Sequence, residues 1–122
     1  MLNAMPSPSE RDTRLYVEDM LGFCDTVLDY TQGMDQARFA ADRMRVDATL
    51  RNLALIGEAA TRVPADIRAL APNLPWRKVV GTRNRLIHAY LGIDADTVWS
   101  IVAADVPALR TALLVLLQAI PG

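Results

Sequence analysis

The sequence contains few of the residues that build disulfides and metal sites. Among its 122 residues are one cysteine, one histidine and one lysine. Because a disulfide needs two thiols, Cys24 forms none within the chain, and its apolar surroundings predict that it packs as a small hydrophobic side chain. A second histidine and any cluster of cysteines or carboxylates at ligand spacing are missing, so we expect neither a metal site nor a cofactor.

Signals for β-strands, signal peptides and membrane spans are also missing. The sequence has no extended alternating run and no Asn-Gly or Asp-Gly hairpin turn. Residues 1–10 carry Pro6 and Pro8 and no apolar run, which is not the pattern of a signal peptide. No stretch is apolar for long enough to suggest a bilayer span. We therefore expect a soluble, cytoplasmic protein.

The charge balance argues against a protein that coats nucleic acid. The net charge is −1 and the isoelectric point is about 5.7, whereas such proteins are strongly basic. Any contact with RNA should come from a local patch, for which Arg43, Arg51 and Arg77 are candidates, although each is equally explained as a solvated surface charge. With 52% hydrophobic and 22% charged residues, the composition predicts one packed domain over residues 1–122, with residues 1–8 flexible.

Apolar periodicity and capping signals predict an all-α, up-and-down bundle of four to five helices. The sequence Ser7-Pro8-Ser9-Glu10 is typical of a helix start, and Asp35 is the predicted cap of a long second helix. Asp105 and Pro107 predict a break or kink near the C-terminus. Five side chains of the first helix are expected to point inward: Leu15, Met20, Phe23, Val27 and Tyr30. The expected helical segments, some of them short, cover residues 8–30, 35–62, 65–70, 75–92, 95–104 and 109–120.

Two of these helices carry more apolar surface than one small bundle can bury. The helix over residues 35–62 places Phe39 and Leu53 on one face and Met44 and Leu55 on roughly the opposite face. The last helix is apolar nearly all round. We therefore predict a homodimer, in which a second copy of the chain covers the apolar surface that one bundle leaves exposed. The alternative is a monomer in which both helices are central.

Residues 81–90 combine the histidine with an arginine that interrupts an apolar stripe. At about 100° per residue along the expected helix, Arg83 lies near the centre of that stripe, where a cation is costly without a partner or a function. Arg83 either pairs with a carboxylate, for which Glu58 is the candidate, or binds phosphate, and the two roles are compatible. His88 follows Asn84 by one turn, so that the amide can set the tautomer of the imidazole.

Simpler structural interpretations stand beside these roles. A lone histidine on a helix is more often a surface or boundary residue than a catalyst, so His88 gains its interest from its neighbours. Tyr90 shares the apolar stripe, and its ring can pack in the core with the hydroxyl at the rim. The pattern of the whole segment therefore decides between the two kinds of interpretation.

The order Arg83-Asn84-x-x-x-His88-x-Tyr90 resembles the R-x4-H-x-Y signature of HepT-type toxins, which belong to the HEPN superfamily of helical ribonucleases. The resemblance extends from about residue 43 to the C-terminus. Its other parts are the sequence Leu55-Ile56-Gly57-Glu58-Ala59-Ala60, the lead-in over residues 76–82, and the later segments 92–94 and 98–99.

The resemblance implies a metal-independent endoribonuclease that acts as a homodimer, with a composite R-x4-H-x-Y site at the subunit interface. Arg83 and His88 would be catalytic, with Asn84 and Glu58 supporting or orienting them. It also implies a toxin of a type VII-like HEPN/MNT toxin–antitoxin system. Such a toxin is neutralised when a minimal nucleotidyltransferase (MNT-type) antitoxin transfers AMP to the motif tyrosine, here Tyr90. The competing hypothesis is a non-catalytic helical module that binds RNA, a nucleotide or another partner, which the acidic isoelectric point favours slightly.

Overall fold

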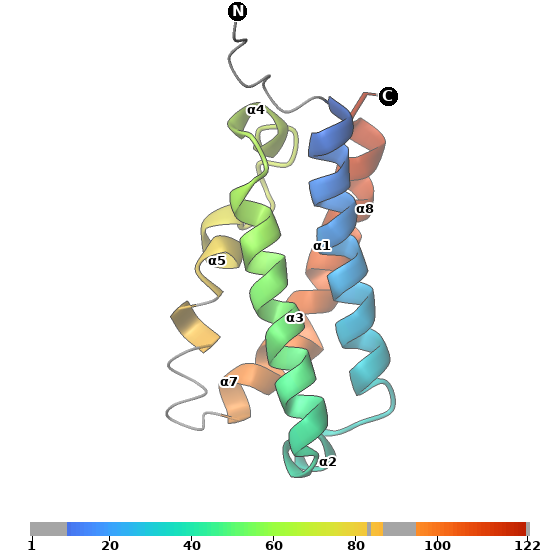
Figure 1. Ribbon diagram of the computed structural model, residues 1–122, viewed down its shortest axis with the longest axis vertical. Helices are drawn as coiled ribbons and strands as arrows, with labels where there is room; N and C mark the ends of the chain where they lie inside the picture. Colours follow the sequence, from blue (N-terminus) through green and yellow to red (C-terminus); the bar gives the residue numbers. More distant parts are fainter. Residues whose placement is uncertain (1–9, 83, 87–94, 122) are drawn as a thin grey trace, which may run out of the picture.

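The computed structural model describes residues 10–82, 84–86 and 95–121, and residues 1–9, 83, 87–94 and 122 lie outside this description. All regular structure among the described residues is helical, as the sequence predicts. In Figure 1, α1, α3 and α8 form the long columns of the bundle, and α2 and α4 lie at its opposite ends. The elements are α1 (Glu10–Thr31), α2 (Gln36–Ala41), α3 (Arg43–Thr61), α4 (Ala65–Arg68), α5 (Trp76–Val80), α7 (Ala95–Ser100), η1 (Ile101–Asp105) and α8 (Val106–Ala119).

The first helix buries one regular stripe against α3 and α8. Every third or fourth side chain is inside the core: Thr13, Val17, Met20, Cys24, Val27 and Thr31. The predicted inward positions are confirmed at Met20 and Val27, whereas Phe23 and Tyr30 are half-buried. The prediction for Leu15 is wrong, because its side chain is 45% exposed. Leu15 precedes Val17 by two residues, about 200° around the helix, and therefore faces away from the core.

The predicted helix over residues 35–62 is two helices, because Asp42 interrupts it. Asp35 caps α2 as predicted, and its carboxylate accepts a hydrogen bond from the Arg38 backbone N–H at 2.8 Å. Asp42 has an extended backbone, and its carboxylate accepts the backbone N–H of Arg45 at 3.1 Å. A second aspartate in a capping geometry therefore ends one helix and begins the next.

The long third helix is buried mainly on one side. Its buried residues are Thr49, Leu53, Ile56, Gly57, Ala59 and Ala60. Of the predicted opposite face, Met44 is 85% exposed and Leu55 is half-buried. Of the other two residues predicted on that face, Ala48 is half-buried and Ala59 is buried, so only the beginning of this side, at Met44, is uncovered within one chain.

The sequence predicts a break or kink at Asp105 and Pro107, and the structure has an irregular turn there but no break in the helical run. This turn is the π-helix η1, and the Val106 N–H donates to the Ile101 carbonyl five residues earlier. Proline cannot donate to the carbonyl four residues back, and its ring crowds that carbonyl. The wider π turn accommodates Pro107 without ending the helical run.

The helical run Ala95–Ala119 is long and apolar enough to cross a membrane by length and composition alone. This finding corrects the expectation that no stretch meets that criterion. A core helix passes the same test, and Val102, Val106 and Leu113 of this run lie in the core.

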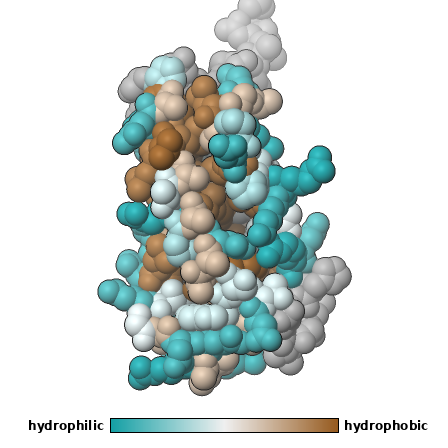
Figure 2. Space-filling view, turned by 180° about the vertical axis from the view of Figure 1, so that it is seen from behind, coloured by the Kyte–Doolittle hydropathy of each residue, from teal (hydrophilic) through white to brown (hydrophobic). Residues whose placement is uncertain are grey.

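The last helix is not buried all round within one chain. Leu114 is 38% and Val115 63% exposed, in contrast to the buried Leu113 and Leu116. Figure 2 shows the side of the molecule that is turned away from the viewer in Figure 1. Apolar surface gathers over the upper half of that side, and its lower half is mostly hydrophilic. The prediction that a single chain leaves part of the apolar surface of this helix exposed is therefore confirmed at Leu114 and Val115.

Candidate functional site

The lead-in to the motif begins as a short helix that is interrupted at Gly81. The Gly81 N–H donates to the Arg77 carbonyl at 2.9 Å, and the Gly81 carbonyl accepts from the backbone N–H groups of Asn84 (3.1 Å) and Arg85 (3.2 Å). Thr82 and residues 84–86 are helical again after this turn. The single helix predicted over residues 75–92 is therefore wrong at its middle, where glycine favours helix least among residues other than proline.

Four side chains hold this segment against the core: Trp76, Val79, Thr82 and Leu86. The predicted stripe is confirmed at Trp76, Val79 and Leu86. Thr82 was not predicted on it, yet it is only 8% exposed, because its hydroxyl donates to the Lys78 carbonyl at 3.1 Å. A threonine whose hydroxyl donates to the carbonyl four residues earlier can be buried without a distant partner.

The structure places only some of the predicted site residues. Arg83, His88 and Tyr90 lie outside the described residues, and their roles stay predictions. Asn84 is exposed. The prediction that Glu58 is buried is wrong, because its carboxylate is 51% exposed and lies 3.8 Å from the Arg62 guanidinium, one turn further along α3. Its pairing with Arg83 stays a prediction.

The three arginines predicted as RNA contacts are all exposed and lie on two different helices. Arg43 begins α3 and Arg51 lies about 12 Å further along it, at 1.5 Å rise per residue. Arg51 borders a shallow hollow with Tyr30, Asp47, Asn52 and Leu55, whereas Arg77 lies on α5. Each therefore remains an individual candidate.

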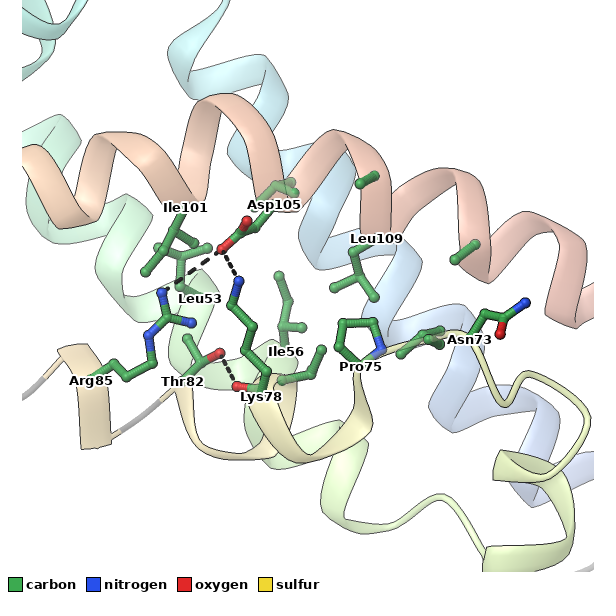
Figure 3. A pocket seen from close by; sticks show the side chains of 15 residues that line it. Leu53, Ile56, Asn73, Pro75, Lys78, Thr82, Arg85, Ile101, Asp105 and Leu109 are labelled. Carbon is green, nitrogen blue, oxygen red and sulfur yellow. Dashed lines mark hydrogen bonds and ion pairs between the residues drawn. The ribbon is translucent and has the colours of Figure 1, made fainter.

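A pocket of about 220 Å³ separates the motif lead-in from the C-terminal helices. Figure 3 shows α3 contributing Leu53 and Ile56 behind it, with α5 on one side and η1 and α8 on the other. The lining is largely apolar. Its members are Leu53, Ile56, Asn73, Leu74, Pro75, Lys78, Val79, Thr82, Arg85, Ile101, Asp105, Val106, Ala108, Leu109 and Ala112.

Three charged side chains meet at one end of the pocket (Figure 3). The Asp105 Oδ2 atom lies 3.4 Å from Lys78 Nζ and 3.8 Å from Arg85 Nη2. One carboxylate thus faces two cations, which leaves this end with a net positive charge. None of the three was a predicted site residue, because they come from α5, the segment 84–86 and η1, and nothing in their sequence spacing brings them together.

Among residues 10–82, 84–86 and 95–121, no group of three or more histidine, cysteine, aspartate or glutamate side chains is arranged to hold a metal ion. The chemistry available at this face is therefore that of cations, one carboxylate, amides and hydroxyls.

Comparison with known proteins identifies the family. A family model described as "Ribonuclease HepT-like" matches residues 20–116, which include the motif and its lead-in. The chain belongs to the HepT-like ribonuclease family. The resemblance in the sequence is thereby confirmed, and with it the HEPN-type helical bundle.

Relatives from archaea and bacteria match this HepT-like chain over most of their length. "Putative RNase MJ1380" from Methanocaldococcus jannaschii is 39% identical over 102 residues, covering 84% of this chain and 94% of the relative. "Probable ribonuclease HepT" from Thermococcus cleftensis is 34% identical over 101 residues, covering 83% and 92%. "Putative RNase TTE0752" from Caldanaerobacter subterraneus is 30% identical over 105 residues, covering 86% and 94%. No solved structure matches this chain.

Proposed function

We propose that this protein is a metal-independent endoribonuclease whose catalytic groups are Arg83 and His88. The observation that carries the proposal is the family match over residues 20–116, which spans the complete R-x4-H-x-Y signature. RNA brings its own nucleophile, the 2′-hydroxyl, so cleavage needs proton transfer and stabilisation of charge at phosphorus. An imidazole can transfer protons and a guanidinium can stabilise charge at phosphorus, so a histidine and an arginine supply these two functions without a metal ion.

The described neighbours of the motif support this assignment. Trp76, Val79 and Leu86 are buried, so the backbone that leads into Arg83 is anchored in the core. Asn84 is exposed on the same segment, where its amide is free to orient either His88 or a phosphate oxygen. Lys78 and Arg85 add positive charge nearby, in a protein that is acidic overall.

A homodimer is part of the proposal. One histidine per chain supplies one proton-transfer group, and a second copy would bring the other. The apolar surface at Leu114 and Val115 supports such an assembly, because exposed apolar patches mark sites of association. The two motifs would then face one another across the subunit interface.

Control by an MNT-type antitoxin is the finer part of the proposal. Transfer of AMP to the Tyr90 hydroxyl would add bulk and negative charge two residues from His88. The modified tyrosine would exclude the phosphates of RNA from the same site by both effects. The protein would then be a toxin of a type VII-like system acting in the cytoplasm.

The second candidate is a helical module that binds RNA or a nucleotide without cutting it. The isoelectric point of about 5.7 favours it slightly, because an acidic protein attracts the RNA backbone weakly. Loss of His88 distinguishes the two, since a binding module tolerates that loss and a nuclease does not.

The test is cleavage of a mixed RNA pool in EDTA by the isolated protein and by its His88→Ala variant. Intact mass first establishes that Tyr90 is unmodified, and circular dichroism establishes that both proteins are folded. Cleavage by the parent alone is the expected result. If neither protein cleaves, the binding module is the better description; if both cleave, His88 is not catalytic.

A further inference from the structure

The 220 Å³ pocket between α5 and η1–α8 combines an apolar body with one charged end. Leu53, Ile56 and Val79 form part of the body, and the charged end is built by Lys78 and Asp105 together with Arg85. Both regions are in view in Figure 3. A ligand that fills this pocket must therefore present an apolar surface and also a polar edge.

We propose that the pocket is a nucleobase subsite, which takes one base of the RNA strand beside the bond to be cleaved. The inference rests on the proposed ribonuclease function and adds to it the place where the substrate is recognised. A nucleobase has two apolar faces and a rim of hydrogen-bonding groups, which matches the two parts of the pocket.

The size of the pocket suits one base. An apolar cavity of about 150 Å³ accepts a benzene ring, so a pocket of about 220 Å³ has room for a larger flat ring system. Pockets that enclose whole drug-sized ligands are about 300 Å³ or more. The ribose and phosphate would therefore remain outside, where the strand continues.

The pocket is also next to the motif along the chain. Thr82 and Arg85 line it, and Arg83 lies between them in the sequence. A base held here brings its own backbone to the segment that carries the predicted catalytic groups. The net positive charge left by Lys78 and Arg85 against Asp105 favours the phosphate of the bound nucleotide.

A second copy of the chain fits this pocket less well. Lys78, Arg85 and Asp105 keep 52%, 36% and 36% of their side chains exposed. An apolar side chain inserted from another subunit would remove water from these charges without replacing its hydrogen bonds, which is costly. A base would replace part of that hydration with its own donors and acceptors.

The Asp105 carboxylate should make the subsite bind some bases more tightly than others. A carboxylate accepts hydrogen bonds only, and it has capacity beyond its two ion pairs. Adenine and cytosine each carry an exocyclic amino group with two N–H donors at the rim of the ring, whereas uracil offers such an acceptor only its ring N3–H, which is flanked by two carbonyl oxygens. We expect binding of adenine- or cytosine-containing strands to exceed that of uracil-containing strands.

Binding of labelled, fully 2′-O-methylated tetranucleotides of A, C or U by the full chain tests this inference separately from catalysis. These strands lack the free 2′-hydroxyl, so cleavage by that route does not disturb the measurement. Ala108→Trp places a ring in the pocket from an exposed position, and Ala119→Trp makes the same change elsewhere on the exposed surface of α8. Asp105→Asn keeps the shape of the side chain and removes its charge.

The expected result is an affinity loss of about 10-fold or more for Ala108→Trp and no change for Ala119→Trp. Asp105→Asn should reduce the advantage of A and C strands over U, because the amide is a weaker acceptor than the carboxylate and its N–H groups repel the amino groups of these bases. Equal binding by Ala108→Trp and the parent would overturn the inference, and so would equal parental binding of A, C and U.

Sedimentation showing that Ala108→Trp alone changes the oligomeric state would instead assign the pocket to a subunit interface. Base-selective binding by a protein that cleaves no RNA would refute the nuclease and leave the subsite standing.

Discussion

The guanidinium carbon of Arg68 lies 5.4 Å from the centroid of the Trp76 ring. The same guanidinium donates hydrogen bonds to the carbonyl of Ala60 at 2.7 Å and to that of Val63 at 3.0 Å. The Trp76 indole N–H in turn donates to the Ala71 carbonyl at 3.1 Å. Arg68 therefore connects the end of α3 to the first residue of α5, and so sets the position from which the motif lead-in starts.

Replacement of Arg68 by alanine should destabilise the protein by about 1–3 kcal/mol, because two charge-assisted hydrogen bonds and a cation–π contact are lost together. Arg68→Lys should fall between the parent and alanine, since an ammonium cannot reproduce the planar fork. Urea unfolding followed by circular dichroism measures both. Arg62→Ala is the matched control, because its exposed 3.8 Å ion pair with Glu58 contributes little. Equal stability of Arg68→Ala and Arg62→Ala would contradict the proposed connection.

Replacement of Asp42 by alanine should lower the melting temperature and loosen the junction between α2 and α3. The hydrogen bond from the Arg45 backbone N–H is the main reason why the pKa of Asp42 lies below its ordinary value of 3.8. Because the folded-state pKa is the lower one, this stabilisation is fully present above about pH 3.8 and is lost as the pH falls through the folded-state pKa.

Thermal melts of parent and Asp42→Ala between pH 2 and pH 7 should therefore converge at the acid end, whereas Asp42→Asn, which retains a capping oxygen, should stay close to the parent at neutral pH. If the difference in melting temperature between the parent and Asp42→Ala persists unchanged below the folded-state pKa, the charge of the Asp42 carboxylate does not contribute to stability.

The Cys24 thiol should resist iodoacetamide in the folded protein at pH 8 and react when the protein is unfolded in urea. Burial, with a smaller contribution from the charge of Asp25, raises the pKa of Cys24 from 9.0 to about 12, so the reactive thiolate is scarce. Intact mass after a timed reaction measures the difference, and equal labelling of folded and unfolded protein would refute it.

The same shift makes stability depend on alkaline pH. Between about pH 9 and pH 12 the unfolded chain loses the Cys24 proton before the folded chain does, so the free energy of unfolding should fall as the pH rises. Cys24→Ala should show a shallower decline over that interval in otherwise identical denaturation experiments.

Modification at Tyr90 should depend on its hydroxyl. Incubation with an MNT-type nucleotidyltransferase and ATP should add AMP to the parent and not to Tyr90→Phe, with Tyr30→Phe as the control that is still modified. Intact mass reports the addition, and the RNA cleavage assay reports its effect. An AMP adduct on Tyr90→Phe would place the modification on another residue.

Local patterns predicted much of the fold. The capping role of Asp35, the burial of Met20 and Val27, and the buried positions Trp76, Val79 and Leu86 all follow from helical spacing and from side chains that bond to nearby backbone. These interactions lie within one or two helical turns, so neighbouring residues specify them. The sequence also predicted the family correctly, because the family's signature is a run of residue types at fixed spacing.

Errors arose where two local signals compete. Asp42 carries a capping side chain inside a run that is otherwise periodic, and Pro107 is disfavoured in a helix that a π turn nevertheless continues. Leu15 is apolar yet lies outside the buried stripe. Counting apolar residues at helical spacing does not weigh a cap, a wider turn or the exact phase of the buried stripe, and these decided the three positions.

The sequence by itself determined the helical class, the helix caps at short range and the motif that identifies the family, because these depend on contacts between residues close in the chain. Only the tertiary structure decided that Glu58 faces solvent and that Lys78, Arg85 and Asp105 meet at the end of one pocket. Such meetings depend on how helices pack and on where a π turn shifts the register, and these are properties of the folded bundle as a whole.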